Sequence, residues 1–214
     1  MLDDPVNSLG GGMFCQPALT ERDELLRLLQ RGLLPPQLPQ IGGVDLAARY
    51  LPMGAGTGGD FYDVFPLQNG SWEIMLGDVC GKGAAAASTA ALARYTIRVA
   101  ALTEREPAPA LELLNHALLT VDPDVECRFC TAIFAHLDLC GPVASLRAAV
   151  AGHPPILVLR SDGTLEAHGP TGPLLGVLDP VVIDEQVIHL WPGEACVLGG
   201  FNWSSQHRSQ RGLR

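Results

Sequence analysis

Residues 57–83 decide the fold, and they read TGGDFYDVFPLQNGSWEIMLGDVCGKG. Two β-strands are predicted here, at residues 61–67 and 72–79, because both runs are rich in aromatic and branched apolar side chains. The sequence NGSW at residues 69–72 is a turn signal between them. We therefore expect two strands joined by a turn, the second of them buried because its apolar run is almost continuous.

Two helices and several short strands are predicted after this stretch. The longer helix covers residues 81–102, where an alanine-rich face suits close packing on a sheet, and the second covers residues 109–121. Further strands are expected after this stretch at RFCTAIFAHLDL, ASLRAAVAGH, PILVLRSDGTLEA, VVIDEQVIHL and EACVLG, and one before it at VDLAARYLPM, residues 44–53. Strands at this spacing, with two consecutive helices, predict an α+β protein with mainly antiparallel sheets rather than a Rossmann-like alternation.

Composition narrows the class of protein. The chain has 214 residues, 47% of them hydrophobic, and a net charge of −9 from 14 basic and 23 acidic residues. The acidic balance argues against a broad nucleic-acid interface, which needs clustered Lys and Arg. No apolar run approaches the roughly 20 residues of a membrane span, and the N-terminus lacks the regions of a signal peptide. We expect a cytoplasmic protein without nucleic-acid or membrane partners.

The six cysteines do not form a recognisable metal or redox site. Only Cys127 and Cys130 have CxxC spacing, and no second pair completes a zinc site. The segment that follows them reads as a strand rather than as the strand-to-helix turn of a redox motif. Reduced thiols are therefore expected.

Four segments are predicted along the chain: a flexible leader at residues 1–17, a linker or switch-type helix at 18–36, a catalytic-type domain at 37–198 and an atypical polar, basic tail at 199–214. The helix is predicted from leucines at helical spacing behind an acidic first turn, and three prolines end it.

Two carboxylates are candidates for chemistry because of their surroundings. Asp60 follows two glycines at the head of a strand, and Asp78 lies at the end of the next strand, before a glycine-punctuated helix start. Hard cations such as Mg²⁺ and Mn²⁺ prefer carboxylate and carbonyl oxygens, so the two side chains and the Val79 carbonyl could bridge a metal pair. An N-cap or turn role is the alternative for either Asp.

Two other motif interpretations are rejected. Lys82 suggests a phosphate-binding loop, but Gly83 follows it where such a loop has Ser or Thr. The GGD at residues 58–60 suggests cyclic-dinucleotide synthesis, but that chemistry needs an acidic residue at the position of Phe61.

Several stretches together resemble the stage-II-sporulation-protein-E-type serine phosphatases, the bacterial branch of the metal-dependent, protein phosphatase 2C-like superfamily. They include GTGGDFYDVF, GDVCGKGAAAASTAALARYTIR, FCTAIFAHLDL, AGHPPILVLRSDG and GPLLGV. The similarity runs in register from about Leu29 to about Leu198.

The resemblance implies a four-layer α-β-β-α sandwich of two mainly antiparallel sheets flanked by helices, with a binuclear Mn²⁺ or Mg²⁺ site at one edge. It assigns Asp60, Asp78 and the backbone carbonyl of Val79 as metal ligands. A metal-bound water would attack phosphoserine or phosphothreonine of a protein, typically an anti-sigma-factor antagonist in partner-switching control. The N-terminal helix resembles an element that links sensor domains to the catalytic core, and a homodimer through this helix is a further expectation.

The C-terminal sequence departs from the family pattern. The family has another metal-ligating Asp in a motif similar to YTDGVTE, and alignment places Phe201 at that position. No Asp or Glu follows Gly199. A domain that is truncated or altered at its C-terminus and lacks one ligand is therefore expected. The alternative function is a catalytically impaired phosphatase-fold fragment that acts as a protein-binding or regulatory module.

Four other polar residues are given structural roles. His153, in AGHPP, is interpreted as structural, because no metal or proton-transfer role follows from the motif. Asp63 is expected on the side of its strand opposite Asp60, with a supporting role as the alternative. Arg94 and Arg98 lie one turn apart on the predicted helix, where an ion-paired or solvated face is preferred to recognition of an acidic partner.

Overall fold

The computed structural model describes residues 34–50, 58–103, 106–121, 129–169 and 172–200, and it has the predicted α+β architecture. Its elements in chain order are β1 (Asp60–Pro66), β2 (Trp72–Val79), α2 (Gly83–Ala100), α3 (Pro107–Leu119), β3 (Cys130–Asp138), β4 (Ala144–Ala151), β5 (Ile156–Leu159), β6 (Leu165–His168), β7 (Glu185–Leu190) and β8 (Ala195–Val197).

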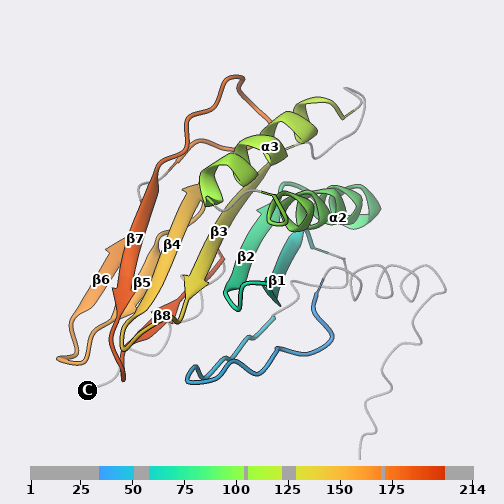
Figure 1. Cartoon of the computed structure of the whole chain (residues 1–214). Coiled ribbons are helices and arrows are strands. Elements are labelled where there is room, and N and C mark those ends of the chain that lie inside the picture. The colour runs from blue at the N-terminus through green and yellow to red at the C-terminus, as the bar shows by residue number, and fades with distance from the viewer. Residues whose placement is uncertain (1–33, 51–57, 104–105, 122–128, 170–171, 201–214) are drawn as a thin grey trace, which may run out of the picture.

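The strands form two antiparallel sheets. One has five strands in the order β1-β2-β3-β4-β7, and the other has three in the order β6-β5-β8. Helices α2 and α3 lie side by side on one face of the five-stranded sheet, and the three-stranded sheet lies behind the other face (Figure 1). The expectation of two mainly antiparallel sheets with helices against them is confirmed.

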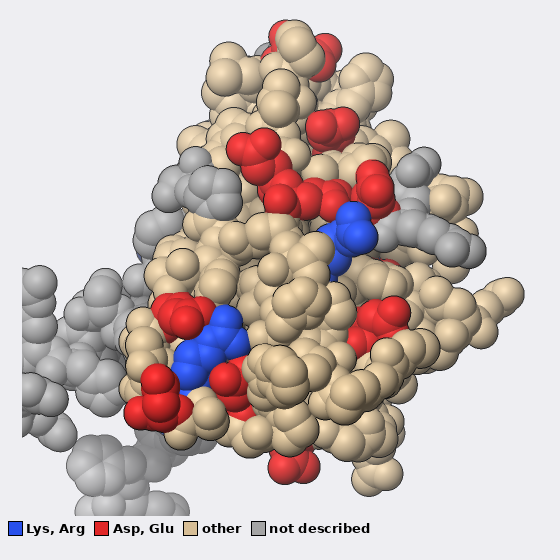
Figure 2. All heavy atoms as spheres, turned by 60° about the vertical axis from the view of Figure 1, so that its left-hand side comes forward, with Lys and Arg blue, Asp and Glu red and all other residues tan. Residues whose placement is uncertain are grey.

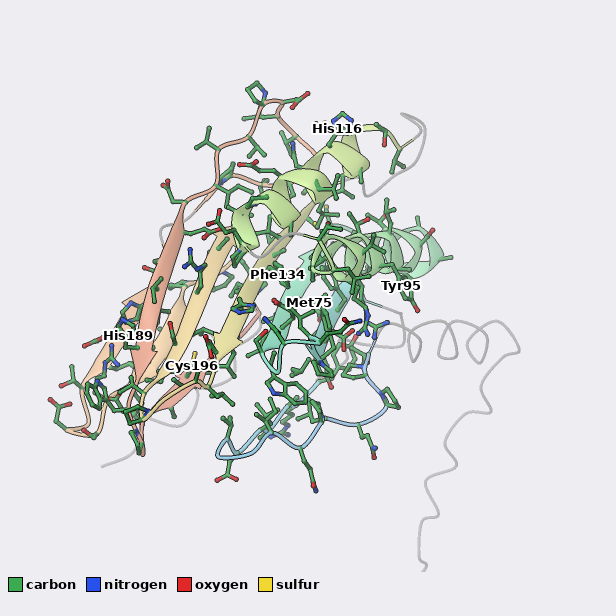
Figure 3. The ribbon with its side chains drawn as sticks, in the orientation of Figure 1. Met75, Tyr95, His116, Phe134, His189 and Cys196 are labelled. Atoms are coloured by element: carbon green, nitrogen blue, oxygen red, sulfur yellow. The ribbon has the colours of Figure 1, made fainter. Side chains whose placement is uncertain are left out.

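The helix-facing core follows from the pleat of β1 and β2. Alternate residues Phe61, Phe65, Met75 and Val79 are buried in one cluster with the alanine-rich side of α2. Met75 and Phe134 extend from the sheet toward the helices in Figure 3. Small side chains on α2 allow the helix backbone close to the sheet, and each large apolar side chain buried there contributes about 1.5–3 kcal/mol.

The opposite faces of the strands build a second core between the two sheets. Ile133, Leu146 and Ile188 of the large sheet pack with Ile156 and Val158 of the small one, and all five are almost completely buried. Strand β2 was predicted to be buried, and this arrangement explains why. The helix-facing core packs on one face of β2 and the core between the two sheets on the other.

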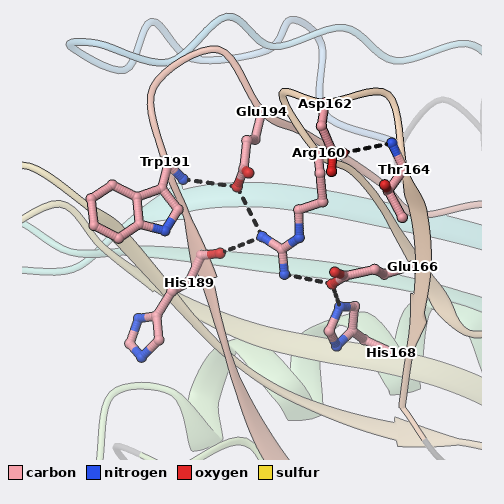
Figure 4. A network of polar contacts seen from close by, with 8 residues as sticks. All are labelled: Arg160, Asp162, Thr164, Glu166, His168, His189, Trp191 and Glu194. Atoms are coloured by element: carbon pink, nitrogen blue, oxygen red, sulfur yellow. Dashed lines mark hydrogen bonds and ion pairs between the residues drawn. The ribbon is translucent and has the colours of Figure 1, made fainter.

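Arg160, just after β5, ties the small sheet to β7 of the large one (Figure 4). Its guanidinium donates to the His189 carbonyl and to Glu194 Oε2, both at 2.8 Å, and to Glu166 Oε2 at 2.6 Å. Asp162 Oδ1 accepts the Thr164 amide at 2.8 Å and closes the β5–β6 turn. The two sheets are therefore held in a fixed relation at this end of the sandwich.

The outward face of the three-stranded sheet is apolar. Leu159 faces Leu165 and Ala195 across the strands, and Leu157 faces Ala167 and Val197. Leu165 is 62% exposed, so no described helix covers this face.

The molecular surface in Figure 2 is rich in acidic side chains, and the basic side chains on that face lie beside acidic ones. Among the ion pairs of the described residues, Arg147 Nη1 lies 3.7 Å from Glu106 Oε1 and 3.6 Å from Glu185 Oε2. The face that Figure 2 shows therefore has no broad basic patch. Neither described helix has the length and apolarity needed to cross a membrane.

One expected strand differs from the structure. The described part of the strand predicted at 44–53 is residues 44–50. Val44 forms an isolated bridge with Ile41, and residues 45–50 form no strand. A strand needs a partner, and within the described ranges this segment pairs with no other strand. The expected leader at 1–17, most of the helix at 18–36 and residues 201–214 of the expected tail lie outside the described residues.

Candidate metal centre

Asp60 and Asp78 face each other across two adjacent strands. Asp60 is the first residue of β1, Asp78 is the second-last residue of β2, and they are direct register partners. Directly opposed residues of an antiparallel pair have Cβ atoms about 4.5–5.5 Å apart. Both side chains lie on the side of the strands that faces the three-stranded sheet, opposite Phe61 and Val79 in the helix-facing core. The structure thus brings the two predicted carboxylates together at the edge of the stacked sheets.

Gly59 allows the backbone just before β1 to lie close to the Val79 carbonyl at the end of β2. A Cβ on Gly59 would lie 2.2 Å from the Val79 carbonyl oxygen, so any larger residue would displace that carbonyl. The Val79 amide also donates to the Gly59 carbonyl at 3.2 Å. Gly81, with φ of 107°, then turns the chain toward α2. The GGD and GDVCGKG motifs therefore meet through their backbones as well as through their carboxylates.

The electrostatics of the pair favour a bound cation. Burial, followed by the charge of Asp78 and a hydrogen bond with it, raises the pKa of Asp60 from 3.8 to about 6. Burial also raises the pKa of Asp78, and the hydrogen bond with Asp60 partly opposes this rise. Two partly desolvated anions side by side are unfavourable until a cation or a proton neutralises them. Among the ion pairs between described residues, none involves either Asp.

The donor set fits a hard divalent cation but does not complete a conventional protein cage. Two carboxylates and a backbone carbonyl are oxygen ligands of the kind that Mg²⁺ and Mn²⁺ accept, with water in the remaining positions. Within the described residues, however, no group of three or more His, Cys, Asp or Glu side chains could hold a metal ion. Asp60, Asp78 and the Val79 carbonyl are thus the only oxygen donors predicted from the sequence that the described structure brings to this edge.

Asp63 lies on the side of β1 opposite Asp60, as its spacing predicted. It lies on the helix-facing side of β1 and is buried, and its carboxylate pairs with Arg94 at 2.7 Å and with Arg98. The Arg98 guanidinium also lies over the Phe65 ring, 4.2 Å from its centroid. The two arginines are therefore ion-paired, and they fix α2 to β1 rather than facing a partner.

The sequence did not predict two histidine contacts, one of them buried and the other partly buried. His153 Nδ1 lies 2.7 Å from Thr131 Oγ1, and His136 Nδ1 lies 2.7 Å from Glu73 Oε1. Burial raises the pKa of Glu73 to about 7, although the hydrogen bond and charge of His136 act against the rise. Alternation along β2 predicts that Glu73 shares a face with Met75, and this was the only sequence signal for its burial.

The cysteine expectations agree with the described part of the chain. Cys80, Cys130, Cys140 and Cys196 are free thiols. Burial raises the pKa of Cys130 to about 12, which keeps it protonated and unreactive. Cys127, the other member of the CxxC pair, lies outside the described residues.

Known proteins share this fold and parts of this sequence. The chain is 27% identical over 198 residues to Protein IcfG of Synechocystis, and this match covers 80% of the chain but only 30% of the relative. The RsbU and RsbW domains of Rv1364c from Mycobacterium tuberculosis superpose with a TM-score of 0.55 at 26% identity, over 65% of this chain and 37% of that one. The PP2C phosphatase domain of SpoIIE from Bacillus subtilis gives a TM-score of 0.55 at 18% identity, over 65% of this chain and 40% of that structure.

The described residues therefore have the fold of a PP2C-type phosphatase domain, and the chain spans about a third of the length of the first two relatives. The family model for stage II sporulation protein E matches residues 68–199, which include Asp78, α2, α3 and every strand from β2 to β8. This match covers more than half of the chain, and we conclude that the chain belongs to the stage II sporulation protein E (SpoIIE) family.

Proposed function

We propose that this chain is a metal-dependent protein serine/threonine phosphatase domain, formed by residues 37–198. The observation that carries the proposal is the pair of opposed carboxylates, Asp60 and Asp78, at the ends of adjacent strands. The raised pKa of Asp60 supports it, because a carboxylate that is unfavourable as a free anion gains most from a nearby cation.

In this proposal Asp60, Asp78 and the Val79 carbonyl hold Mn²⁺ or Mg²⁺ as a binuclear centre. Two divalent cations would supply an activated water and neutralise the phosphate oxygens during in-line attack. The protein holds both carboxylates on hydrogen-bonded strands, so little rearrangement is needed when the cations and the phosphate arrive. Gly59 keeps the Val79 carbonyl accessible beside them, because any side chain at this position would clash with that oxygen.

The proposed substrate is a phosphoserine of a regulatory protein, such as an anti-sigma-factor antagonist. Membership of the SpoIIE family and the similarity to a protein with RsbU and RsbW domains support this class of substrate. The acidic surface argues against nucleic acid as a partner. A cytoplasmic location would suit such a substrate, and dimerisation through the N-terminal helix remains a prediction.

The test is Mn²⁺-dependent hydrolysis of p-nitrophenyl phosphate and of a phosphoserine peptide by the purified chain. We expect Asp60→Asn and Asp78→Asn each to abolish turnover, whereas Asp162→Asn, a change to an exposed turn residue, leaves it unchanged. Metal-dependent turnover that survives the double change at Asp60 and Asp78 would disprove the assignment of the site.

A second candidate function is a non-catalytic, protein-binding phosphatase fold. Two observations favour it: the described residues contain no cluster of three metal-ligating side chains, and the sequence has no Asp or Glu after Gly199. This candidate predicts that the chain binds a phosphoserine protein without hydrolysing it in Mn²⁺ or Mg²⁺. Measurable turnover that depends on Asp78 would exclude it.

A further inference from the structure

Residues 172–178 run along the end of the large sheet that carries the carboxylates. They belong to the connection between β6 and β7, which passes α3 at the end of the sheet where β2 finishes (Figure 1). Leu175 exchanges two backbone hydrogen bonds with Cys130, at 3.1 and 3.0 Å, and Cys130 is the register partner of Val79. The segment therefore lies against the start of β3, one strand away from the backbone of Asp78 and Val79.

Two residues hold this segment in a fixed conformation. The side chain of Leu175 is completely buried in the helix-facing core. The Asn115 amide of α3 accepts from the Gly176 amide through Oδ1 at 2.8 Å and donates through Nδ2 to the Leu178 carbonyl at 2.9 Å. A molecule that binds here would meet a surface that is already ordered, which lowers the entropic cost of binding.

Leu174 extends the row of side chains that begins with the two carboxylates. Asp60, Asp78 and Thr131 are successive register partners on β1, β2 and β3, so they share one face of the sheet. In line with the next strand, a Cβ at Gly152 would lie 2.8 Å from Leu174 Cδ2 and 3.3 Å from Thr131 Cγ2. Because Gly152 has no side chain, Leu174 has room to lie beside Thr131, on the face that carries the carboxylates.

Two apolar side chains are open to solvent beside this row. Leu174 is 40% exposed and Phe129 is 38% exposed. Phe129 precedes β3, and its carbonyl accepts the Cys80 amide at 3.1 Å, one residue beyond Val79. Exposed apolar side chains that gather at one place on a surface are typical of a contact site for another molecule.

The spacing of the strands indicates which part of a substrate reaches Leu174. Neighbouring strands lie about 4.8 Å apart, so Leu174, in line with β4, lies roughly 10 Å from Asp78 on β2. An extended peptide advances about 3.3 Å per residue. With a phosphoserine at the carboxylates, a side chain two or three positions away therefore reaches Leu174.

We propose that Leu174 and Phe129 form a docking surface for the phosphoprotein substrate, in which Leu174 receives an apolar side chain two or three positions from the phosphoserine. This inference rests on the proposed function and adds a sequence preference to it. The surface continues the carboxylate row, so its occupant is the segment that carries the phosphate. An apolar side chain is preferred there because its contact with Leu174 removes apolar surface from water on both molecules.

The experiment compares kcat/KM in Mn²⁺ for phosphoserine peptides that carry one Leu, placed at each nearby position in turn, in a Ser and Gly background. We expect the full chain to hydrolyse the peptide with Leu two or three positions from the phosphoserine about tenfold more efficiently than the peptide without Leu. Leu174→Ser should abolish this ratio, and Leu174→Met, which keeps the apolar volume, should retain most of it. Leu165→Ser is the matched control, because it changes an exposed leucine of β6 and should keep the full ratio.

Each outcome has a separate meaning. A wild-type chain without a positional preference for Leu overturns the proposal, and so does a preference that Leu174→Ser leaves unchanged. If circular dichroism shows that Leu174→Ser does not fold, Phe129→Ser decides: it should lower the ratio about threefold or more, and an unchanged ratio overturns the docking surface.

Failure of the proposed function is recognised separately. If the wild-type chain hydrolyses no phosphopeptide in Mn²⁺, the proposed function fails. Fluorescence anisotropy of the same labelled peptides then tests the surface by itself. Equal affinity of wild type and Leu174→Ser for the Leu-bearing peptide would overturn the proposal, whereas about tenfold weaker binding by Leu174→Ser would support it.

Discussion

Replacing Asp60 by Asn should stabilise the metal-free protein at alkaline pH. The carboxyl has its pKa raised from 3.8 to about 6, first by burial and then by the neighbouring Asp78. Its anion is therefore less favourable in the folded protein than in the unfolded chain. Asn has nearly the same shape and no charge, so the substitution removes this unfavourable contribution together with the proposed metal ligand.

The magnitude follows from the pKa values. A rise from 3.8 to about 6 corresponds to about 3 kcal/mol of stability that is present below pH 3.8 and lost as the pH rises through about 6. Solvent screens this partly exposed carboxyl, so the expected loss of stability is about 1–2 kcal/mol. Asp60→Asn should therefore raise the free energy of unfolding by about 1–2 kcal/mol at pH 8, with a smaller gain at pH 4.5.

The assay is urea unfolding of both proteins in EDTA at the two pH values. Asp162→Asn is the control, and it should lower the free energy of unfolding at pH 8. The Thr164 amide lowers the pKa of Asp162, so the charge of this carboxylate is favourable in the folded protein. An Asp60→Asn protein no more stable than wild type at pH 8 would refute the reasoning. So would a gain of the same size at pH 4.5 and pH 8.

Three further outcomes are expected. Gly77→Ala should lower the free energy of unfolding by about 1–3 kcal/mol, because its Cβ would lie 2.4 Å from the Phe61 ring. Gly42→Ala is the control in the same urea assay. Its Cβ would have no atom within 4 Å, so its free energy of unfolding should stay within about 0.5 kcal/mol of wild type. Asp63→Asn should cost about 3 kcal/mol in thermal unfolding, since it leaves two arginines without their buried carboxylate. Gly200→Asp should tighten Mn²⁺ binding in a calorimetric titration, because it adds a carboxylate near Asp60, whereas Gly200→Asn should not. Equal affinities of these last two variants would contradict that geometry.

The strands that carry the site could be predicted from the sequence. The apolar and aromatic residues of 61–67 and 72–79 predict two strands, and the turn between them pairs the strands as a hairpin. Successive side chains of each strand then point to opposite faces. The position of Asp60 at the start of one strand and of Asp78 near the end of the other then follows from the hairpin, and the structure opposes them as register partners. The helices were predictable for a similar reason, since their patterns are long and local.

Contacts between distant segments could not be predicted in this way. The contact of His153 with Thr131 joins residues 22 positions apart, and that of His136 with Glu73 joins residues 63 apart. Both depend on the order of strands in the sheet and on the turn after β4, which no local pattern specifies. The strand expected at residues 44–53 was wrong in its described part because apolar composition alone does not supply a hydrogen-bonding partner.

Anomalous diffraction from crystals of the chain grown with Mn²⁺ tests the central claim most directly. We expect two anomalous peaks beside the Asp60 and Asp78 carboxylates, about 3.5–4 Å apart, and neither peak in crystals of Asp78→Asn. Mn²⁺ bound elsewhere on the molecule, with the two carboxylates still hydrogen-bonded to each other, would contradict it.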